Sequence, residues 1–316
     1  GLVILDEEQE HTYKSESSPR YHARDVAKFR CAYHKTLLVL ASATPSIESY
    51  YYAQTGRYTL NQLPHRYGGA RLPKVRFVDM NRELEAGNDS IYSRELLTEI
   101  EKNRKVHKQS IILLNRRGYN TFVSCKACGN VVTCPNCSIS LTYHAANQRL
   151  MCHYCGFSQP VPERCPACGG PLKTIGTGTQ KVQEELEFLF PDMETDRMDA
   201  DTVSAVNTHE KILEHFQKEN VPVLLGTQMV AKGLNLPNVT LVGVLDADLS
   251  LYTGGYLAGE TTFNMLTQVV GRAGRGDSPG KAIIQTMVPD HQVIRYAAAH
   301  CCTHIWPVPL PRSLPS

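Results

Sequence analysis

Four Cys-x-x-Cys pairs between residues 125 and 168 constrain the fold of this chain more than any other feature. The segment holds few large apolar side chains, so its own core cannot offset the backbone entropy lost on folding. Zinc prefers four thiolates in a tetrahedron, and a structural zinc site contributes on the order of 10–16 kcal/mol of apparent binding energy. The segment therefore predicts two closed zinc sites, with the eight ligands Cys125, Cys128, Cys134, Cys137, Cys152, Cys155, Cys165 and Cys168.

The spacing of the pairs favours a nested arrangement of the two sites. Cys134/Cys137 and Cys152/Cys155 are separated by 14 residues, close to the usual spacing of a two-turn zinc ribbon. The first and last pairs, Cys125/Cys128 and Cys165/Cys168, would then share the other ion. Sequential pairing would force a tight loop between the first two pairs. A thioredoxin-like redox role would leave four such motifs in one segment unexplained. With eight thiols available, His144 and His153 are interpreted as facing solvent or as lying beside the metal ligands, and not as ligands themselves.

Composition favours an intracellular, metal-binding interpretation over a secreted disulfide scaffold. The chain has 316 residues, 42% of them hydrophobic, which is ample for two globular cores without disulfides. No apolar run approaches the roughly 18 residues of a membrane helix, and no signal peptide is recognisable. We expect a cytoplasmic protein with no membrane partner. A net charge of +2 limits any nucleic-acid surface to a local patch.

Short apolar runs alternate with amphipathic stretches, which predicts an α/β fold built on a parallel sheet with flanking helices. A Pro- and Gly-rich stretch, residues 64–73, is interpreted as a linker between two lobes. The predicted helices include Ser93–Lys102, Thr179–Phe190 and Glu210–Lys218. The predicted strands are Leu2–Leu5, Leu37–Ala41, Val75–Val78, Ser110–Leu114, Val223–Leu225, Leu241–Leu245 and Ala282–Gln285.

Carboxylates follow the first predicted strand, at the sheet edge where a parallel-sheet nucleotidase presents its catalytic acids. Asp6 would hold Mg²⁺, and Glu7 would orient and deprotonate the attacking water. Ser42 and Thr44 follow the next strand; they would sense a bound phosphate, or else form an ordinary capped turn.

Two further motifs lie late in the chain. Gly226-Thr-Gln-Met-Val-Ala-Lys-Gly233 follows a buried strand, and its glycines allow close approach of backbone to a ligand. Gln268-Val-Val-Gly-Arg272-Ala-Gly-Arg275 places two arginines among glycines. The forked guanidinium groups of Arg272 and Arg275 suit the charge that develops on a transferring phosphoryl group.

In this order, Asp6-Glu-Glu-Gln9, Ser42-Ala-Thr-Pro45 and the two late motifs resemble motifs II, III, V and VI of superfamily-2 helicases. The eight-cysteine insertion after Leu113-Leu-Asn-Arg-Arg-Gly118 makes the chain similar, over most of its length, to the primosomal protein N′ (PriA) family of bacterial replication-restart helicases. This resemblance implies that ATP and Mg²⁺ are cofactors and that Glu8, Gln9, Gly233 and Gln268 contact the nucleotide. It also implies DNA contacts in an aromatic-rich loop between His11 and His22.

The implied architecture is a pair of RecA-like helicase lobes with a two-zinc insertion in the second. Residues 1–66 would form the end of the first lobe, 67–122 the start of the second, 123–172 the insertion, 173–300 the rest of the second lobe, and 301–316 a disordered or non-native tail.

The implied activity is ATP-dependent, 3′-to-5′ unwinding of DNA that restarts stalled forks and initiates primosome assembly. Single-stranded and forked DNA, primosome proteins and single-stranded-DNA-binding protein would be its partners. The printed sequence contains no Gly-x-x-x-x-Gly-Lys-[Ser/Thr] loop. We therefore expect the family's phosphate loop and its C-terminal domain to lie outside residues 1–316, and these residues alone not to hydrolyse ATP. The alternative is a non-catalytic zinc-ribbon module, binding DNA or protein, on a motor remnant. A measurement of ATP hydrolysis separates the two.

Overall fold

A computed structural model describes residues 1–15, 18–63, 72–114, 121–144, 148–152, 155–175, 179–199, 208–227, 230, 236–253, 255–274 and 278–299. These residues divide into two compact units, the first ending at Leu63 and the second starting at Leu72. Most of the predicted linker and all of the predicted tail lie outside the described residues. Among the helices that are described, none combines the length and the apolar character needed to cross a lipid bilayer.

The first unit is a small βαβ arrangement. Strands β1 (Leu2–Asp6) and β2 (Leu37–Ala41) pair in parallel, with Leu2 opposite Leu37 and Asp6 opposite Ala41. Helix α1 (Ala23–His34) connects them. A 3-10 turn, η1 (His11–Tyr13), and helix α2 (Ile47–Gln54) complete the unit. Both predicted strands are confirmed, and both end where the motif residues begin.

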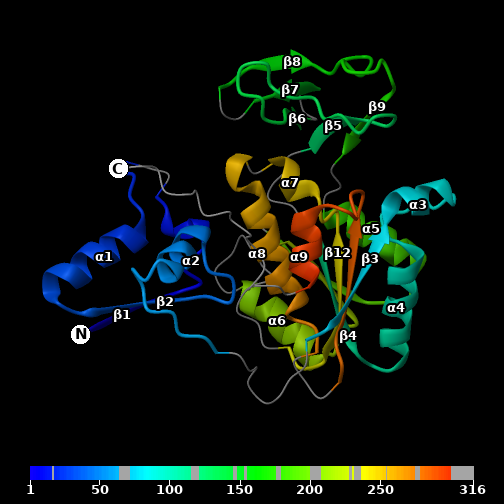
Figure 1. Ribbon diagram of the computed structural model, residues 1–316. Helices are drawn as coiled ribbons and strands as arrows, with labels where there is room; N and C mark the ends of the chain where they lie inside the picture. The colour runs from blue at the N-terminus through cyan, green and yellow to red at the C-terminus, as the bar shows by residue number, and fades with distance from the viewer. Residues whose placement is uncertain are drawn as a thin grey trace. The chain divides into compact units, whose positions relative to one another are not determined.

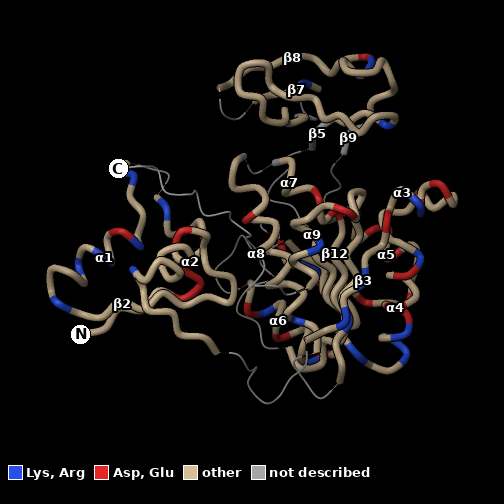
Figure 2. Tube along the Cα trace, viewed as in Figure 1, with Lys and Arg blue, Asp and Glu red and all other residues tan. Residues whose placement is uncertain are grey.

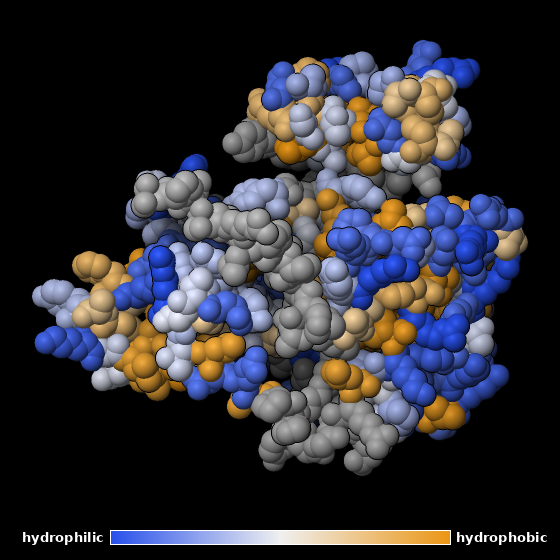
Figure 3. Space-filling view, viewed as in Figure 1, coloured by the Kyte–Doolittle hydropathy of each residue, from blue (hydrophilic) through white to orange (hydrophobic). Residues whose placement is uncertain are grey.

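One face of the β1–β2 pair is open to solvent. Alternate residues of the two strands are exposed, among them Leu2, Ile4 and Leu37. Parallel strands usually have both faces covered, so the exposed apolar side chains of this pair are unusual, and Figure 3 shows apolar residues on the surface of this unit.

The second unit is built on a six-stranded, all-parallel sheet of order β10-β11-β4-β12-β13-β3. Every residue of the three central strands β11, β4 and β12 is buried, as expected for strands covered on both faces. The strands are β3 (Lys74–Asp79), β4 (Gln109–Leu114), β10 (Thr195–Met198), β11 (Val223–Gly226), β12 (Val239–Leu245) and β13 (Lys281–Thr286).

Helices cover both faces of this sheet, with α4 and α5 on one side and α8 and α9 on the other (Figure 1). Leu96 and Ile100 of α4 and Leu186 of α5 pack in one core cluster with Ile112 of β4 and Leu225 of β11. Charged residues of both signs alternate along the outer surface of α4 (Figure 2). The helices of this unit are α3 (Met80–Glu85), α4 (Arg94–Lys105), α5 (Thr179–Leu189), α6 (Thr208–Lys218), α7 (Leu249–Thr253), η4 (Gly255–Leu257), α8 (Ala258–Val270) and α9 (Gln292–Ala298).

The α/β architecture, with its parallel sheet and cysteine-rich insertion, is confirmed. The seven predicted strands and the three predicted helices all form, with ends shifted by a few residues. The edge strand β10 and the long helices α1 and α8 were not predicted.

The cysteine segment is inserted between β4 and α5 and forms its own antiparallel sheet of order β8-β7-β6-β5-β9. Its strands are short, as in a fold built around turns: β5 (Thr121–Cys125), β6 (Thr142–His144), β7 (Arg149–Met151), β8 (Ser158–Pro160) and β9 (Leu172–Ile175). We refer to residues 121–175 as the cysteine module.

Two glycines set the path of the chain after α8. Gly274 adopts a left-handed conformation with φ of 72°, and its N–H donates to the carbonyl of Val239 at 3.1 Å. A methyl group on Gly280 would lie 2.5 Å from the carbonyl carbon of Ala273, which is backbone and cannot swing aside. This close approach lets the turn that carries Arg272 pack against the start of β13.

We expect Gly280→Ala to lower the free energy of unfolding by about 1–3 kcal/mol, the usual cost of overpacking. Chemical denaturation measures the change. Gly259→Ala, in the first turn of α8, is the matched control, because among the described atoms a methyl there meets only the side chain of Val293 in α9, with Cγ2 at 3.4 Å, an ordinary contact. The control should be neutral or slightly stabilising. Equal stability of the two variants would contradict the packing argument.

Candidate metal centres and motor motifs

The eight paired cysteines come together in two groups of four. The outer centre comprises Cys125, Cys128, Cys165 and Cys168, and the inner centre comprises Cys134, Cys137, Cys152 and Cys155. Within each group the sulfur atoms all lie within 4.8 Å of one another. The Sγ atoms of Cys125 and Cys168 are 3.5 Å apart, and those of Cys134 and Cys155 are 3.6 Å apart. This grouping is the nested one predicted from the spacing.

All four Cys-x-x-Cys turns share one backbone geometry. The N–H of the first cysteine donates to the carbonyl five residues on, and its carbonyl accepts the N–H four residues on. In the Cys134 turn these bonds are 2.7 Å, to Ile139, and 2.8 Å, from Ser138. The fourth residue after the first cysteine is left-handed in every turn: Gly129, Ser138, Gly156 and Gly169. The repeated geometry presents both thiols of each pair on the same side.

Hydrogen bonding within the turns lowers the pKa of some of these thiols, while burial and neighbouring sulfurs raise the pKa of others. The backbone N–H groups of Cys128 and Ala127 lower the pKa of Cys125 to about 6, and the backbone N–H of Phe157 lowers that of Cys155 to about 6. The neighbouring sulfurs raise the pKa of Cys137. Because a metal ion binds thiolates and displaces their protons, four close sulfurs with backbone N–H donors fit zinc. The ion would supply a structural cross-link and no chemistry.

The apolar core of the cysteine module is small. Val123, Val132, Leu141 and Leu150 are buried in one cluster that also includes two of the cysteines. Each of these side chains contributes roughly 1.5–3 kcal/mol when fully buried, far below the entropy cost of ordering the segment. We therefore expect the folding of the module to depend on bound zinc.

The motif II turn continues directly from β1. Glu7 has a left-handed backbone with φ of 49°, and its N–H donates to Asp6 Oδ1 at 3.0 Å. Gln9 links this turn to the next strand: its Nε2 donates to Glu7 Oε2 at 2.7 Å, and its Oε1 accepts from Ser42 Oγ at 2.5 Å. The two predicted catalytic carboxylates are therefore adjacent at the end of β1, and Gln9 contacts the carboxylate of Glu7.

Glu8 has a structural role that the sequence did not reveal. Its side chain is 1% exposed, and both oxygens accept hydrogen bonds from within the unit. Oε1 accepts from the backbone N–H of Ser46 at 2.6 Å, and Oε2 accepts from Arg24 Nη1 at 2.8 Å. The Glu8 carboxylate therefore points into the unit and bonds to its neighbours. The nucleotide contact that the resemblance implies for Glu8 stays a prediction.

The hydroxyl residues after β2 also have local partners. Ser42 Oγ accepts from the backbone N–H of Thr44 at 2.9 Å, as in a capped turn, while it donates to Gln9. Thr44 is 1% exposed, and its Oγ1 has no hydrogen-bond partner among the described atoms. Both of the suggested roles, capping and phosphate sensing, remain compatible with this turn.

The remaining motif residues belong to the second unit. Gln268 lies in the last turn of α8, and Arg272 lies in the turn that follows and is 8% exposed. Gly226 ends β11 so tightly that a methyl group there would lie 2.6 Å from the carbonyl oxygen of Met198. This is a contact within the protein, and the predicted approach of the backbone to a ligand stays a prediction. Gly233 and Arg275 lie outside the described residues.

The comparisons with known proteins fit this arrangement. Residues 134–160 match the family described as PriA DNA helicase Cys-rich region domain, and residues 175–277 match the helicase conserved C-terminal domain. The sheet of the second unit is thus a helicase lobe. Among solved structures, S. cerevisiae Dbp5 bound to RNA and ADP BeF3 is similar with a TM-score of 0.48 and 14% identity, over 95% of this chain and 56% of that one.

Several relatives are similar along nearly the whole chain. Replication restart protein PriA of Bacillus subtilis is 49% identical over 95% of this chain and 37% of its own length. The proteins of the same name from Synechocystis and Chlamydia pneumoniae are 45% and 42% identical, over 95% and 94% of this chain and 37% and 40% of their own lengths. The chain is thus similar to these PriA proteins along nearly its whole length, and it spans well under half of the length of these relatives.

We expect Ser138→Gly to strengthen the inner metal centre by up to about 1 kcal/mol, because a left-handed backbone costs most residues about 1–2 kcal/mol and glycine little. Ser138 is exposed and has φ of 57°, so the change removes strain without removing buried contacts. The chelator concentration that extracts half of the zinc is the measurement. Gly156→Ser, the reverse change in the partner turn, should shift it the other way. A shift of the same sign in both variants would contradict this explanation.

Purified protein should contain two zinc ions per chain, and single substitutions should remove one of them. Cys134→Ser and Cys152→Ser should release the same ion, while Cys125→Ser should release the other, because each ion needs all four of its thiolates. Metal analysis gives the stoichiometry. Combining Cys134→Ser with Cys152→Ser should cost no more zinc than either change alone, whereas combining Cys134→Ser with Cys125→Ser should remove both ions. Loss of both ions in the Cys134→Ser/Cys152→Ser variant, with loss of only one in the Cys134→Ser/Cys125→Ser variant, would refute the nested grouping.

Proposed function

We propose that this chain is the part of an ATP-dependent DNA helicase that carries the catalytic carboxylates, the second motor lobe and a zinc-stabilised module. The observation that carries the proposal is the insertion of two four-cysteine centres between β4 and α5 of a helicase lobe, in a chain 49% identical to a replication restart protein. The proposed reaction is ATP hydrolysis coupled to 3′-to-5′ movement along DNA, in the restart of stalled replication forks.

The motif II turn supplies the chemistry of this reaction. Asp6 would bind Mg²⁺ and Glu7 would orient and deprotonate the attacking water, roles that two adjacent carboxylates at the end of a parallel strand can divide between them. Gln9 forms hydrogen bonds with Glu7, at the end of β1, and with Ser42, just after β2. A shift of one of these strand ends would therefore be transmitted to the other. Arg272 and Arg275 would neutralise charge on the phosphates.

The cysteine module would act outside the nucleotide site. Zinc bound by its eight thiolates would hold the module's fold and present its surface to DNA or to a protein partner. We propose single-stranded and forked DNA, primosome proteins and single-stranded-DNA-binding protein as partners. Loss of the cysteines should therefore impair unwinding more than ATP hydrolysis.

We expect Glu7→Gln, in the full-length protein that carries this span, to leave ATP binding nearly intact and to lower kcat by about 10²–10⁴-fold, the usual contribution of a general base. The change keeps the shape of the side chain and removes its ability to accept a proton. Steady-state ATPase rates with and without single-stranded DNA are the measurement.

Glu10→Gln is the matched control, because Glu10 lies in the same turn and had no predicted role in the reaction. It should retain most of the activity. DNA-stimulated turnover close to wild type in Glu7→Gln would show that another group activates the water.

A further inference from the structure

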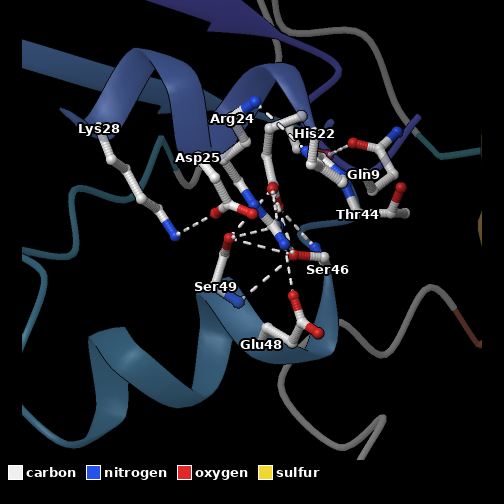
Figure 4. Close-up of polar contacts among 11 residues, drawn as sticks. Gln9, His22, Arg24, Asp25, Lys28, Thr44, Ser46, Glu48 and Ser49 are labelled. Carbon is white, nitrogen blue, oxygen red and sulfur yellow. Dashed lines mark hydrogen bonds and ion pairs between the residues drawn. The ribbon is translucent and has the colours of Figure 1, made fainter. Parts of the chain in front are cut away.

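A buried arginine lies at the centre of the first unit. The side chain of Arg24, in the first turn of α1, is 8% exposed. Its Nη1 donates to Glu8 Oε2 at 2.8 Å and to the hydroxyls of Ser46 at 2.7 Å and Ser49 at 3.2 Å. Its Nη2 donates to Glu48. The guanidinium thereby joins α1, the motif II turn and the start of α2 (Figure 4).

Glu8 is the acceptor on which the contacts between α1, the motif II turn and the start of α2 converge. Besides Arg24 and the N–H of Ser46, its carboxylate accepts from Ser49 Oγ at 3.0 Å and from Ser46 Oγ at 3.2 Å. The backbone N–H of Glu8 donates to the carbonyl of Ala41 at 3.2 Å, which ties the same residue to the end of β2. A carboxylate buried this deeply requires a paired charge and filled lone pairs. Arg24 supplies the charge.

The proposed catalytic residues lie on both sides of this anchored position. Glu7 directly precedes Glu8 and Gln9 directly follows it. Glu7 also holds a left-handed backbone conformation, with φ of 49°, that a residue of its type adopts only when its surroundings impose it. Rotating or releasing Glu8 would let this turn relax, and it would move the hydrogen bond between Gln9 and Glu7.

Arg24 is placed to position other groups and not to touch a phosphate itself. Both terminal nitrogens of the guanidinium bond to oxygens within the unit, and the side chain has almost no exposed surface. Contact with a nucleotide or a DNA backbone would require it to leave Glu8 and strand a buried carboxylate. The planar fork also spans Glu8 and Glu48 at once, which the single ammonium of a lysine cannot do in the same geometry.

We propose that Arg24 is a positioning residue for the catalytic carboxylate Glu7, acting through the buried carboxylate of Glu8. The proposal rests on the proposed function, in which Glu7 activates water for ATP hydrolysis. Loss of the Arg24 fork should therefore lower the rate of the chemical step and leave the binding of ATP unchanged.

The test compares Arg24→Lys with wild type in the full-length protein. We expect kcat for DNA-stimulated ATP hydrolysis to fall by about tenfold or more while KM for ATP changes by less than about twofold, the pattern of an interaction that acts on the transition state. Arg30→Lys is the matched control, an exposed arginine of the same helix. It should leave both constants unchanged.

A second comparison separates positioning from general loss of structure. In a Glu7→Gln background, Arg24→Lys should produce little further loss in single-turnover hydrolysis, because the group that it positions is already gone. Losses that multiply would overturn the proposal. The proposal would also be overturned if the Arg24→Lys protein has a lower thermal midpoint and its kcat falls only at assay temperatures close to that midpoint.

Ser49→Ala provides the test if Arg24→Lys does not fold, because it removes only one donor to Glu8. It should lower kcat by about threefold with KM unchanged. An unchanged kcat in Ser49→Ala, or in a folded Arg24→Lys protein, would overturn the role of Arg24. Absence of ATP hydrolysis in the wild-type protein would instead refute the proposed function.

Discussion

The arrangement of this protein depends on parallel strand pairing. In a parallel sheet all strands end at the same edge, so every loop that follows a strand is delivered to that edge whatever its distance in sequence. The strands β4, β11 and β12 pair in parallel, with one register shift between Val239 and Leu241 of β12, and are buried along their whole length. The cysteine module follows β4, the glycine motif begins at Gly226 at the end of β11, and helix α7 follows β12. The same rule in the first unit puts Asp6 beside Ala41, and thus motif II beside Ser42.

The cysteine module obeys a different constraint, because its apolar core is small and its repeated turns place the thiols. Each turn repeats two backbone hydrogen bonds and one left-handed residue, so the position of the thiols is encoded within six residues. Gly170 shows how closely the outer centre is packed: a methyl group there would lie 3.1 Å from the sulfur of Cys125 and 2.9 Å from Ala127 Cβ. A module of this kind can be inserted into a lobe without changing the core of that lobe.

Local patterns predicted most of the elements, and contacts distant in sequence account for what they missed. Apolar runs marked the buried strands, but β10 reads Thr-Asp-Arg-Met and lies at the sheet edge, where Asp196 binds His215 instead of packing in the core. The nested cysteine grouping followed from spacing alone. The role of Glu8 could not be predicted from local spacing, because its partners Arg24, Ser46 and Ser49 lie 16, 38 and 41 residues away in the sequence. A run of three acidic residues gives no sign of which one points inward.

Hydrogen bonds around α7 link the cysteine module to α8, the helix that precedes Arg272. Ser140 Oγ, in the module, donates to the carbonyl of Tyr252 in α7 at 2.8 Å, and Ser250 Oγ and Thr262 Oγ1 lie 2.6 Å apart between α7 and α8. Helix α8 then leads directly into the turn of Arg272. The start of α7 is held by the buried Asp248, which accepts from the backbone N–H of Met287 at 3.1 Å and whose pKa is raised by burial. A displacement of the module must therefore either break the hydrogen bond between Ser140 and Tyr252 or move α7 as well. Movement of α7 is opposed by the hydrogen bond between Asp248 and Met287 at the end of β13.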